Sequence, residues 1–197
     1  GYRTGAFVGA YVLDRRFGLA QGFGIYDDQV GAKAGLLGFA ERKADQTTDR
    51  AIRWLSSQRN RPYFLWVHYY DPHSPHDPPA PHRKAHALPY DGEIAFTDAQ
   101  LGRLFDSLKR SGRESNTIVA VVSDHGESLG EHGELTHAVL VYESTLRVPL
   151  MIAGPGVPGG ATVEARVSAV DLAPTLEALL AAGWVAAGLG WYERVSP

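Results

Sequence analysis

The chain has 197 residues, of which 44% are hydrophobic and 21% are charged, and its formal net charge is −3. That composition is ordinary for a globular domain with a sizeable core, and it excludes the basic footprint of a nucleic-acid-binding protein. The absence of cysteine excludes a disulfide framework, thiolate zinc ligation and a cysteine nucleophile within these residues. No apolar run reaches the roughly 18 residues that a membrane span needs, so no span is predicted.

The first half of the chain predicts strands alternating with a helix. Residues 6–12 and 62–70 are apolar and favour strands, and residues 14–30, rich in Gly, Asp and aromatics, favour a long ordered loop. Between them, Asp45 or Thr47 is expected to cap a helix that runs to about residue 58.

The Pro- and His-rich stretch 71–89 predicts irregular structure, since Pro lacks the amide donor that helices and strands need. An amphipathic helix is expected over residues 91–111. Its apolar positions recur at helical spacing: Ile94, Leu101, Leu104, Phe105 and Leu108.

Two further strands, a loop and a helix are expected in the second half. The strands are residues 116–123 and 149–153, with a loop over 124–136 after the first. Asp171 is expected to cap a final helix that begins at Leu172. Alternating strands and helices predict an α/β fold with a largely parallel sheet.

An apolar, β-branched run ends abruptly at Asp124 and His125. Such a run is typical of a buried strand, and ligands in open α/β sheets bind beyond the carboxyl ends of strands. A carboxylate beside an imidazole is a pair of divalent-metal ligands. The alternative is a polar junction in which Asp124 caps a turn.

All eight histidines lie between His68 and His137, which indicates a site. His73 follows the strand over 62–70, and His137 closes the loop that begins at Asp124. If these strands are neighbours in a parallel sheet, the loops open at one edge. His73 and His137 could then donate hydrogen bonds to an anionic substrate or protonate a leaving group.

Simpler roles are assigned to several other polar residues. His68 is expected to be a core histidine and His132 a loop residue with a lesser claim to substrate contact. His76 is expected on the surface, with a smaller claim to the pocket. Glu127 is expected to face solvent or to orient a metal ligand.

Several motifs in one order resemble the sulfatase family of the alkaline-phosphatase superfamily over about residues 2–180. They are the Ser-Asp-His-Gly-Glu-Ser-Leu-Gly-Glu-His-Gly run at 123–133, the Phe-Leu-Trp-Val-His to Pro-His segment at 64–73, and the segments 142–150, 154–157 and 170–176. The resemblance implies an alkaline-phosphatase-like α/β fold, incomplete here, with a largely parallel sheet flanked by helices.

The resemblance also implies roles for the matching positions. Asp124 and His125 match metal ligands, His73 matches the proton donor to the leaving oxygen, and His137 falls where many members place a lysine. One divalent metal ion is implied: calcium for a sulfatase, or manganese, magnesium or zinc for a phosphoesterase.

The family's first metal carboxylates and its nucleophile segment have no counterpart in this sequence, so no nucleophile is assigned and formylglycine is expected only in a missing segment. We therefore expect a fragment with a partial family domain at residues 1–182 and a divergent or truncated tail at 183–197.

The expected function is metal-dependent hydrolysis of sulfate esters by the full-length parent, with the fragment inactive alone. One alternative is a phosphodiester, phosphonate or phosphomonoester hydrolase of the same superfamily. Another is a non-catalytic pseudoenzyme or truncated product. The expected partner is an anionic sulfate or phosphate ester. Localisation stays open, with the periplasm and the extracellular space among the alternatives, and so does the oligomeric state.

Overall fold

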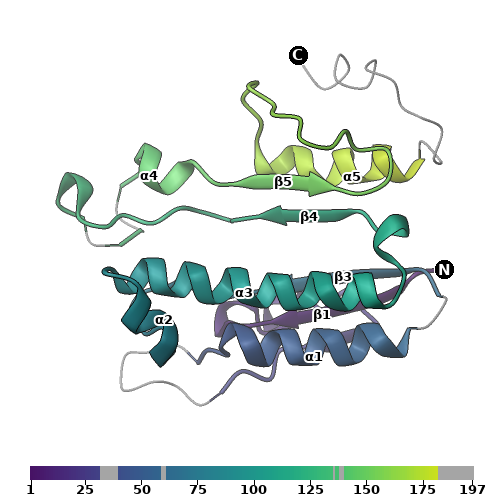
Figure 1. The fold of residues 1–197 in the computed structure, drawn as a ribbon, viewed down its shortest axis with the longest axis horizontal. Helices are drawn as coiled ribbons and strands as arrows, with labels where there is room; N and C mark the ends of the chain where they lie inside the picture. The colour runs from purple at the N-terminus through teal and green to yellow at the C-terminus, as the bar shows by residue number, and fades with distance from the viewer. Residues whose placement is uncertain (32–39, 59–60, 135, 138–139, 182–197) are drawn as a thin grey trace. The chain divides into compact units, whose positions relative to one another are not determined.

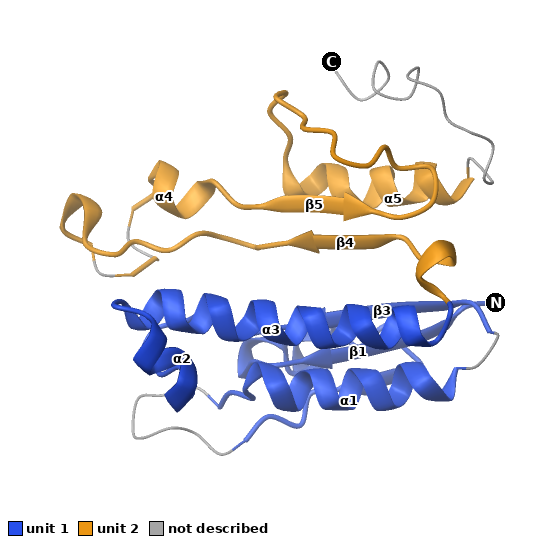
Figure 2. Cartoon of the chain, viewed as in Figure 1, with its two compact units in different colours: residues 1–112 blue, residues 113–197 orange. Residues whose placement is uncertain are grey.

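The computed structural model describes residues 1–31, 40–58, 61–134, 136–137 and 140–181 (Figure 1). The chain divides into two compact units, residues 1–112 and 113–197 (Figure 2). The boundary expected at residue 182 and the tail after it lie outside the described residues.

The first unit contains a parallel sheet of three strands in the order β2-β1-β3. β1 (Arg3–Val8) pairs in parallel with both β2 (Ile25–Asp27) and β3 (Tyr63–His68). Because β1 is central and covered on both faces, its residues Ala6, Phe7 and Val8 are all buried. The predicted parallel sheet is therefore confirmed in this unit.

The two faces of β1 follow from the alternation of side chains along a strand. Phe7 faces α1 (Ala44–Ser57), where its ring centroid lies 6.1 Å from that of Trp54. Ala6 and Val8 form the core of the opposite face together with Tyr26. The central strand is thus buried on both faces, whereas Ile25 of β2 and Phe64 of β3 are 48% and 50% exposed.

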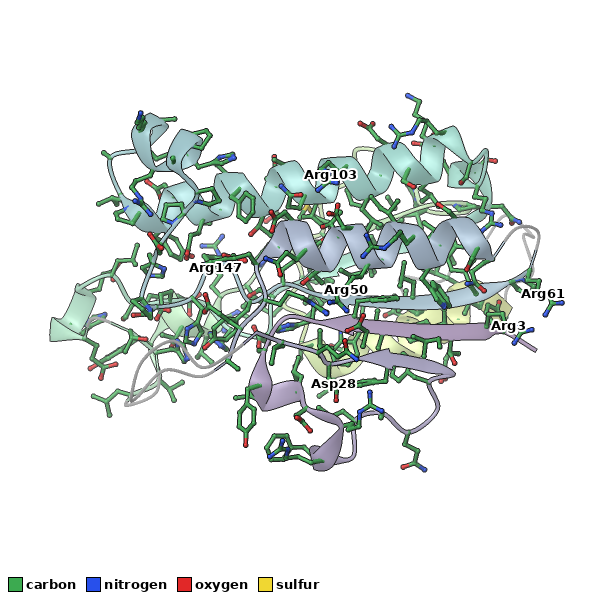
Figure 3. The ribbon with its side chains drawn as sticks, turned by 90° about the horizontal axis from the view of Figure 1, so that it is seen from below. Arg3, Asp28, Arg50, Arg61, Arg103 and Arg147 are labelled. Carbon is green, nitrogen blue, oxygen red and sulfur yellow. The ribbon has the colours of Figure 1, made fainter. Side chains whose placement is uncertain are left out.

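Helix α3 (Pro89–Arg110) lies along α1 in the first unit (Figure 1). Arg103 of α3 forms an ion pair with Asp49 of α1 at 2.5 Å. Figure 3 labels Arg50, also on α1, which pairs at 2.9 Å with Asp27 at the end of β2. Ion pairs therefore join the helices to each other and to the sheet.

Two elements of the first unit differ from the sequence prediction. β2 lies inside the stretch 14–30 that was expected to be a loop, because three residues suffice to pair with β1. α2 (Ala80–Ala85) lies inside the stretch 71–89 that was expected to be irregular. It is possible there because Pro81 is at the start of the helix, where its missing amide costs little.

The beginning of α1 is also capped differently from the prediction. Lys43 occupies the N-cap position and makes no side-chain cap bond. The Ala44 amide donates to Asp71 Oδ2 at 2.9 Å. The side chain that caps this helix therefore comes from a distant segment, which local sequence signals do not reveal.

The predicted apolar face of α3 is partly wrong. Ile94 is 43% exposed and Phe105 is 38% exposed, whereas Glu93, Phe96 and Gln100 are buried. The buried face of α3 includes polar residues because this helix covers the polar loop over residues 73–77.

The second unit contains an antiparallel pair, β4 (Val119–Val122) and β5 (Leu150–Ala153). Among the described residues between them, the chain forms a 3₁₀ turn and the single-turn helix α4 (Glu143–Leu146). Val122 is 38% exposed, so β4 is less buried than its apolar sequence predicted.

Helix α5 (Leu172–Ala181) follows a short 3₁₀ turn in the second unit. Asp171 does not cap α5 directly: its Oδ2 accepts the Ser168 amide at 2.8 Å in a capping box. The 3₁₀ turns of the two units are Tyr11–Leu13, Arg15–Phe17, Glu114–Asn116, Glu131–Gly133 and Ala169–Asp171. Within the described ranges, no helix has the length and hydropathy of a membrane span.

Candidate active site

His73 lies in the loop that follows the carboxyl end of β3 in the first unit. All three strands of that sheet run parallel, so this loop opens at the edge where α/β proteins bind ligands. The half-buried ring of His73 stacks on that of Tyr70 with centroids 4.1 Å apart and planes inclined by 20°. The stack fixes the orientation of the imidazole.

The hydrogen bonds of His73 define its tautomer. Nδ1 lies 2.6 Å from the Ser74 carbonyl oxygen, which only accepts, so Nδ1 carries the proton. Nε2 lies 3.2 Å from the Tyr70 hydroxyl. Burial, with a smaller contribution from Glu41, raises the pKa of Tyr70, so its hydroxyl stays protonated at neutral pH and can donate to Nε2. Nε2 is therefore the atom of His73 that takes up or releases a proton.

A buried carboxylate holds the loop that carries His73. Glu93 of α3 is 1% exposed, and its Oε1 accepts the Asp77 amide at 2.8 Å. Its Oε2 accepts the His73 amide at 3.2 Å and lies 3.0 Å from His76 Nδ1. The apolar spacing of residues 91–111 predicted this helix but gave Glu93 no role. The signal that could have identified Glu93 is an acidic residue three positions before Phe96, on the helix face that is buried.

A second buried carboxylate, Asp71, anchors the start of the same loop. Its Oδ1 lies 3.1 Å from Lys43 Nζ, which is also 3.5 Å from Glu93 Oε1. Burial alone would lower the pKa of Lys43, but the surrounding carboxylates outweigh burial and raise it. The ammonium therefore stays charged and offsets part of the negative charge of Asp71 and Glu93.

Asp124 and His125 follow β4 in the second unit. Asp124 Oδ2 lies 3.8 Å from His125 Nε2, and both side chains reach solvent. His125 Nδ1 donates to the Gly126 carbonyl at 2.9 Å, which leaves the lone pair of the neutral ring on Nε2. One carboxylate oxygen and one imidazole nitrogen are thus available as metal ligands, the donor types that divalent cations take.

Gly126 in this motif is required by a close backbone contact. A Cβ at this position would lie 2.1 Å from the Ser144 carbonyl oxygen, and the Gly126 amide donates to the Thr145 carbonyl at 2.8 Å. The Asp-His-Gly sequence therefore places the Asp124 and His125 side chains immediately before a backbone junction with α4.

Glu127 binds His137 within the second unit. Glu127 Oε1 accepts the His137 amide at 2.6 Å and lies 3.1 Å from His137 Nδ1. The ring centroids of His137 and His125 are 4.0 Å apart. Glu127, which the sequence related to a metal ligand, therefore holds the neighbouring His137 and directs its Nε2 away from the carboxylate.

His132 and His76 have different surroundings. His132 is exposed, has a left-handed backbone with φ of 61°, and stacks on Tyr142 with centroids 4.0 Å apart. A non-glycine residue in this region is uncommon and indicates local strain. His76 is half-buried, since Glu93 and the Tyr90 ring, at 5.3 Å, both contact it.

The predicted residues therefore form two groups, each within its own unit. His73 and His76 are together in the first, and Asp124, His125 and His137 in the second. In the part of the chain that is described, no three His, Cys, Asp or Glu side chains gather as a metal site. Convergence of His73 with the metal pair stays a prediction.

Comparisons with known proteins show a consistent relationship. A family model described as Sulfatase matches residues 1–182. A sulfatase of Formosa agariphila is 42% identical over 83 residues, which are 42% of this chain and 16% of that protein. The choline-sulfatase of Rhizobium meliloti is 40% identical over 87 residues, which are 44% of this chain and 17% of that enzyme. The matched part is thus a small fraction of these relatives' length.

Solved structures show the same fold. A phosphonate monoester hydrolase of Agrobacterium radiobacter aligns with a TM-score of 0.71 and 22% identity, over 92% of this chain and 56% of that chain. A protein of the alkaline phosphatase superfamily from Vibrio parahaemolyticus aligns with a TM-score of 0.57 and 21% identity, over 78% and 38% of the two chains. The predicted alkaline-phosphatase-like α/β fold is confirmed.

Proposed function

This chain belongs to the sulfatase family, and on that ground we propose that the protein hydrolyses sulfate esters. The observation that carries the proposal is the family match over residues 1–182, supported by the likeness to a choline-sulfatase. The substrate is an anionic ester, and the reaction breaks the bond between its sulfur and the leaving oxygen.

We assign Asp124 and His125 as ligands of one divalent cation, with calcium as the preferred ion for a sulfatase. When bound, the cation would polarise the ester as a Lewis acid. Their donor atoms suit this role, because one is a carboxylate oxygen and the other is an unprotonated ring nitrogen. The remaining ligands and the nucleophile, a formylglycine in sulfatases, are assigned to a segment that this sequence does not contain.

His73 and His137 are assigned to the substrate. His73, protonated at both nitrogens, would deliver the Nε2 proton to the leaving oxygen while Nδ1 stays bonded to the Ser74 carbonyl. His137, held at Nδ1 by Glu127, would direct Nε2 toward an oxygen of the anion. In both cases Nδ1 is bonded to a neighbouring acceptor, and we assign the chemistry to Nε2.

The second candidate is hydrolysis of phosphodiesters, phosphonates or phosphomonoesters by the same residues. It is favoured by the fold likeness to a phosphonate monoester hydrolase, which covers 92% of this chain. With such a substrate, manganese, magnesium or zinc would be the expected ion. A non-catalytic role for the isolated chain is the third outcome that experiment must distinguish.

The proposal is tested with variants of the full-length protein, assayed on an aryl sulfate, an alkyl sulfate and the matching phosphate esters, with metal content measured for each. Asp124→Ala should lose both metal and nearly all activity. His73→Ala should keep the metal and lose about a hundredfold to ten-thousandfold in turnover, the range of a positioned general acid. Its loss should be smaller on the aryl ester, whose leaving group needs little protonation.

His132→Ala is the matched control, because His132 is an exposed histidine in the same region of the sequence. It should change activity far less than His73→Ala. Equal losses on both leaving groups, or loss of metal from His73→Ala, would show that His73 is not the leaving-group acid. Hydrolysis of only the phosphate esters would select the second candidate, and no hydrolysis of any ester would select the third.

A further inference from the structure

One carboxylate of α3, that of Glu93, hydrogen-bonds loop 73–77. Glu93 accepts the backbone amides of His73 and Asp77 at 3.2 and 2.8 Å, and its Oε2 lies 3.0 Å from His76 Nδ1. The side chain is 1% exposed, so these contacts are shielded from water. Hydrogen bonds to a charged acceptor in such a place are stronger than bonds between neutral groups.

The residue before Glu93 independently indicates a close junction with the same loop. A Cβ on Gly92 would lie 2.9 Å from Pro78 Cγ, and Pro78 is itself fully buried. Gly92 therefore lets the backbone of α3 approach the loop, and Glu93 then reaches its amides. These two contacts explain why a glycine and an acidic residue are adjacent in the first turns of this helix.

We propose that Glu93 is a positioning residue for the reaction: it fixes the backbone of loop 73–77 and thereby holds His73 over the substrate. The proposal deepens the function proposed above and depends on it for its catalytic consequence. Glu93 touches no substrate. It acts through the His73 amide, and the same oxygen that accepts this amide also orients the ring of His76.

A cation lies beside Glu93 and links it to a second carboxylate. Lys43 Nζ lies 3.5 Å from Oε1 and bridges to Asp71, which caps α1. The loop that carries His73 is thus attached through Glu93 to α3 and through Asp71 to α1; α1 packs on β1 and β3, and α3 packs on α1.

The structural test is Glu93→Gln, with Asp98→Asn on the exposed side of α3 as the control. Both variants remove one negative charge from the same helix. A glutamine has one acceptor oxygen and presents an amide group to the remaining donors. Hydrogen exchange of the His73 or Asp77 amide should therefore accelerate on the order of tenfold or more in Glu93→Gln and stay unchanged in Asp98→Asn.

A measurement on the unaltered protein covers the case in which Glu93→Gln does not fold. NMR couplings through hydrogen bonds should connect the His73 and Asp77 amides with the Glu93 carboxylate carbon. Their absence would overturn the proposal. This measurement needs no substrate, so it stays decisive even if sulfate-ester hydrolysis is disproved.

The catalytic test uses the full-length protein. Glu93→Gln should lower kcat by roughly ten- to a hundredfold, the usual effect of an outer positioning group, with metal content unchanged. The loss should be larger on the alkyl sulfate than on the aryl sulfate, as for His73→Ala. Combining the two substitutions should cost little more than His73→Ala alone.

Two results would overturn the positioning role. One is an additive double variant with equal losses on both esters. The other is faster exchange of all amides of the first unit alike, because Glu93 would then stabilise the fold without specifically placing His73.

Discussion

Three of the candidate histidines have Nδ1 bonded to a neighbour in their own part of the chain. His73 bonds the Ser74 carbonyl, His125 the Gly126 carbonyl, and His137 the Glu127 carboxylate. Fixing Nδ1 as the donor leaves Nε2 with the lone pair in each neutral ring. This common tautomer suits each of the roles that we propose: metal ligand for His125, proton donor for His73 and anion contact for His137. The three roles therefore differ through the groups that surround each ring.

The sequence identified the histidines because strand ends and motifs mark them, but it did not identify what holds them. Glu93 was overlooked because it is 20 residues from His73 and lies on a helix. Glu127 was noticed only for its closeness in sequence to His125. A hydrogen-bond partner separated by a loop depends on tertiary packing, which residue spacing does not encode.

We predict that Glu127→Gln changes the tautomer of the His137 ring and lowers the stability of the fold. Burial alone would raise the pKa of Glu127, but the hydrogen bonds from His137 outweigh burial and hold it below the ordinary 4.5. A lowered carboxyl pKa stabilises the fold above that pH, and the effect disappears as the pH falls through the folded pKa. Glu127→Gln should therefore cost about 1 kcal/mol at pH 7 and progressively less in acid.

Urea unfolding at several pH values checks this prediction, and nitrogen NMR of the His137 ring reports its tautomer. Glu164→Gln, an exposed position in the same unit, is the control and should change neither quantity. A pH-independent cost, or an unchanged His137 tautomer, would show that the Glu127–His137 bond does not determine the state of the ring.

Helices and strands with a strong local sequence pattern were predictable, and those that depend on pairing with a distant segment were not. The apolar run over residues 62–70 predicted a strand, and the helical spacing over residues 91–111 predicted a helix. The structure has β3 at Tyr63–His68 and α3 at Pro89–Arg110. β2 was missed because it is three residues long and owes its structure to pairing with β1. The antiparallel pairing of β4 with β5 was not predictable for the same reason, since it depends on a partner strand that is distant in the sequence.

The contact of β1 with α1 gives a prediction for Gly5. A Cβ on Gly5 would lie 2.8 Å from the Trp54 ring, so Gly5→Ala should destabilise the first unit by about 1–3 kcal/mol through overpacking. Gly102→Ala is the opposite control. Gly102 is exposed in α3 and has open space at its Cβ, so alanine should stabilise that helix by about 0.5–1 kcal/mol. Urea unfolding followed by Trp fluorescence measures both changes.

At the scale of the whole molecule, the candidate site is divided between the two units. His73 and Glu93 belong to residues 1–112, and Asp124, His125 and His137 belong to residues 113–197. Each group is internally ordered by its own hydrogen bonds. The function that we propose requires that the loop after β3 and the loop after β4 act on one substrate.

We predict that these loops meet, and that Mn²⁺ bound at Asp124 and His125 broadens the ring signals of both His137 and His73 in NMR spectra. Two protein ligands give weak affinity, because affinity rises with ligand number and charge, so the broadening should grow gradually with added metal. Paramagnetic broadening falls steeply with distance, and the ring of His82 on α2, to which we assign no role at the metal, is the comparison. Asp124→Asn should abolish the selective effect. Broadening of His125 and His137 without His73 would place the leaving-group acid elsewhere, whereas uniform weak broadening of all histidines would remove the metal assignment itself.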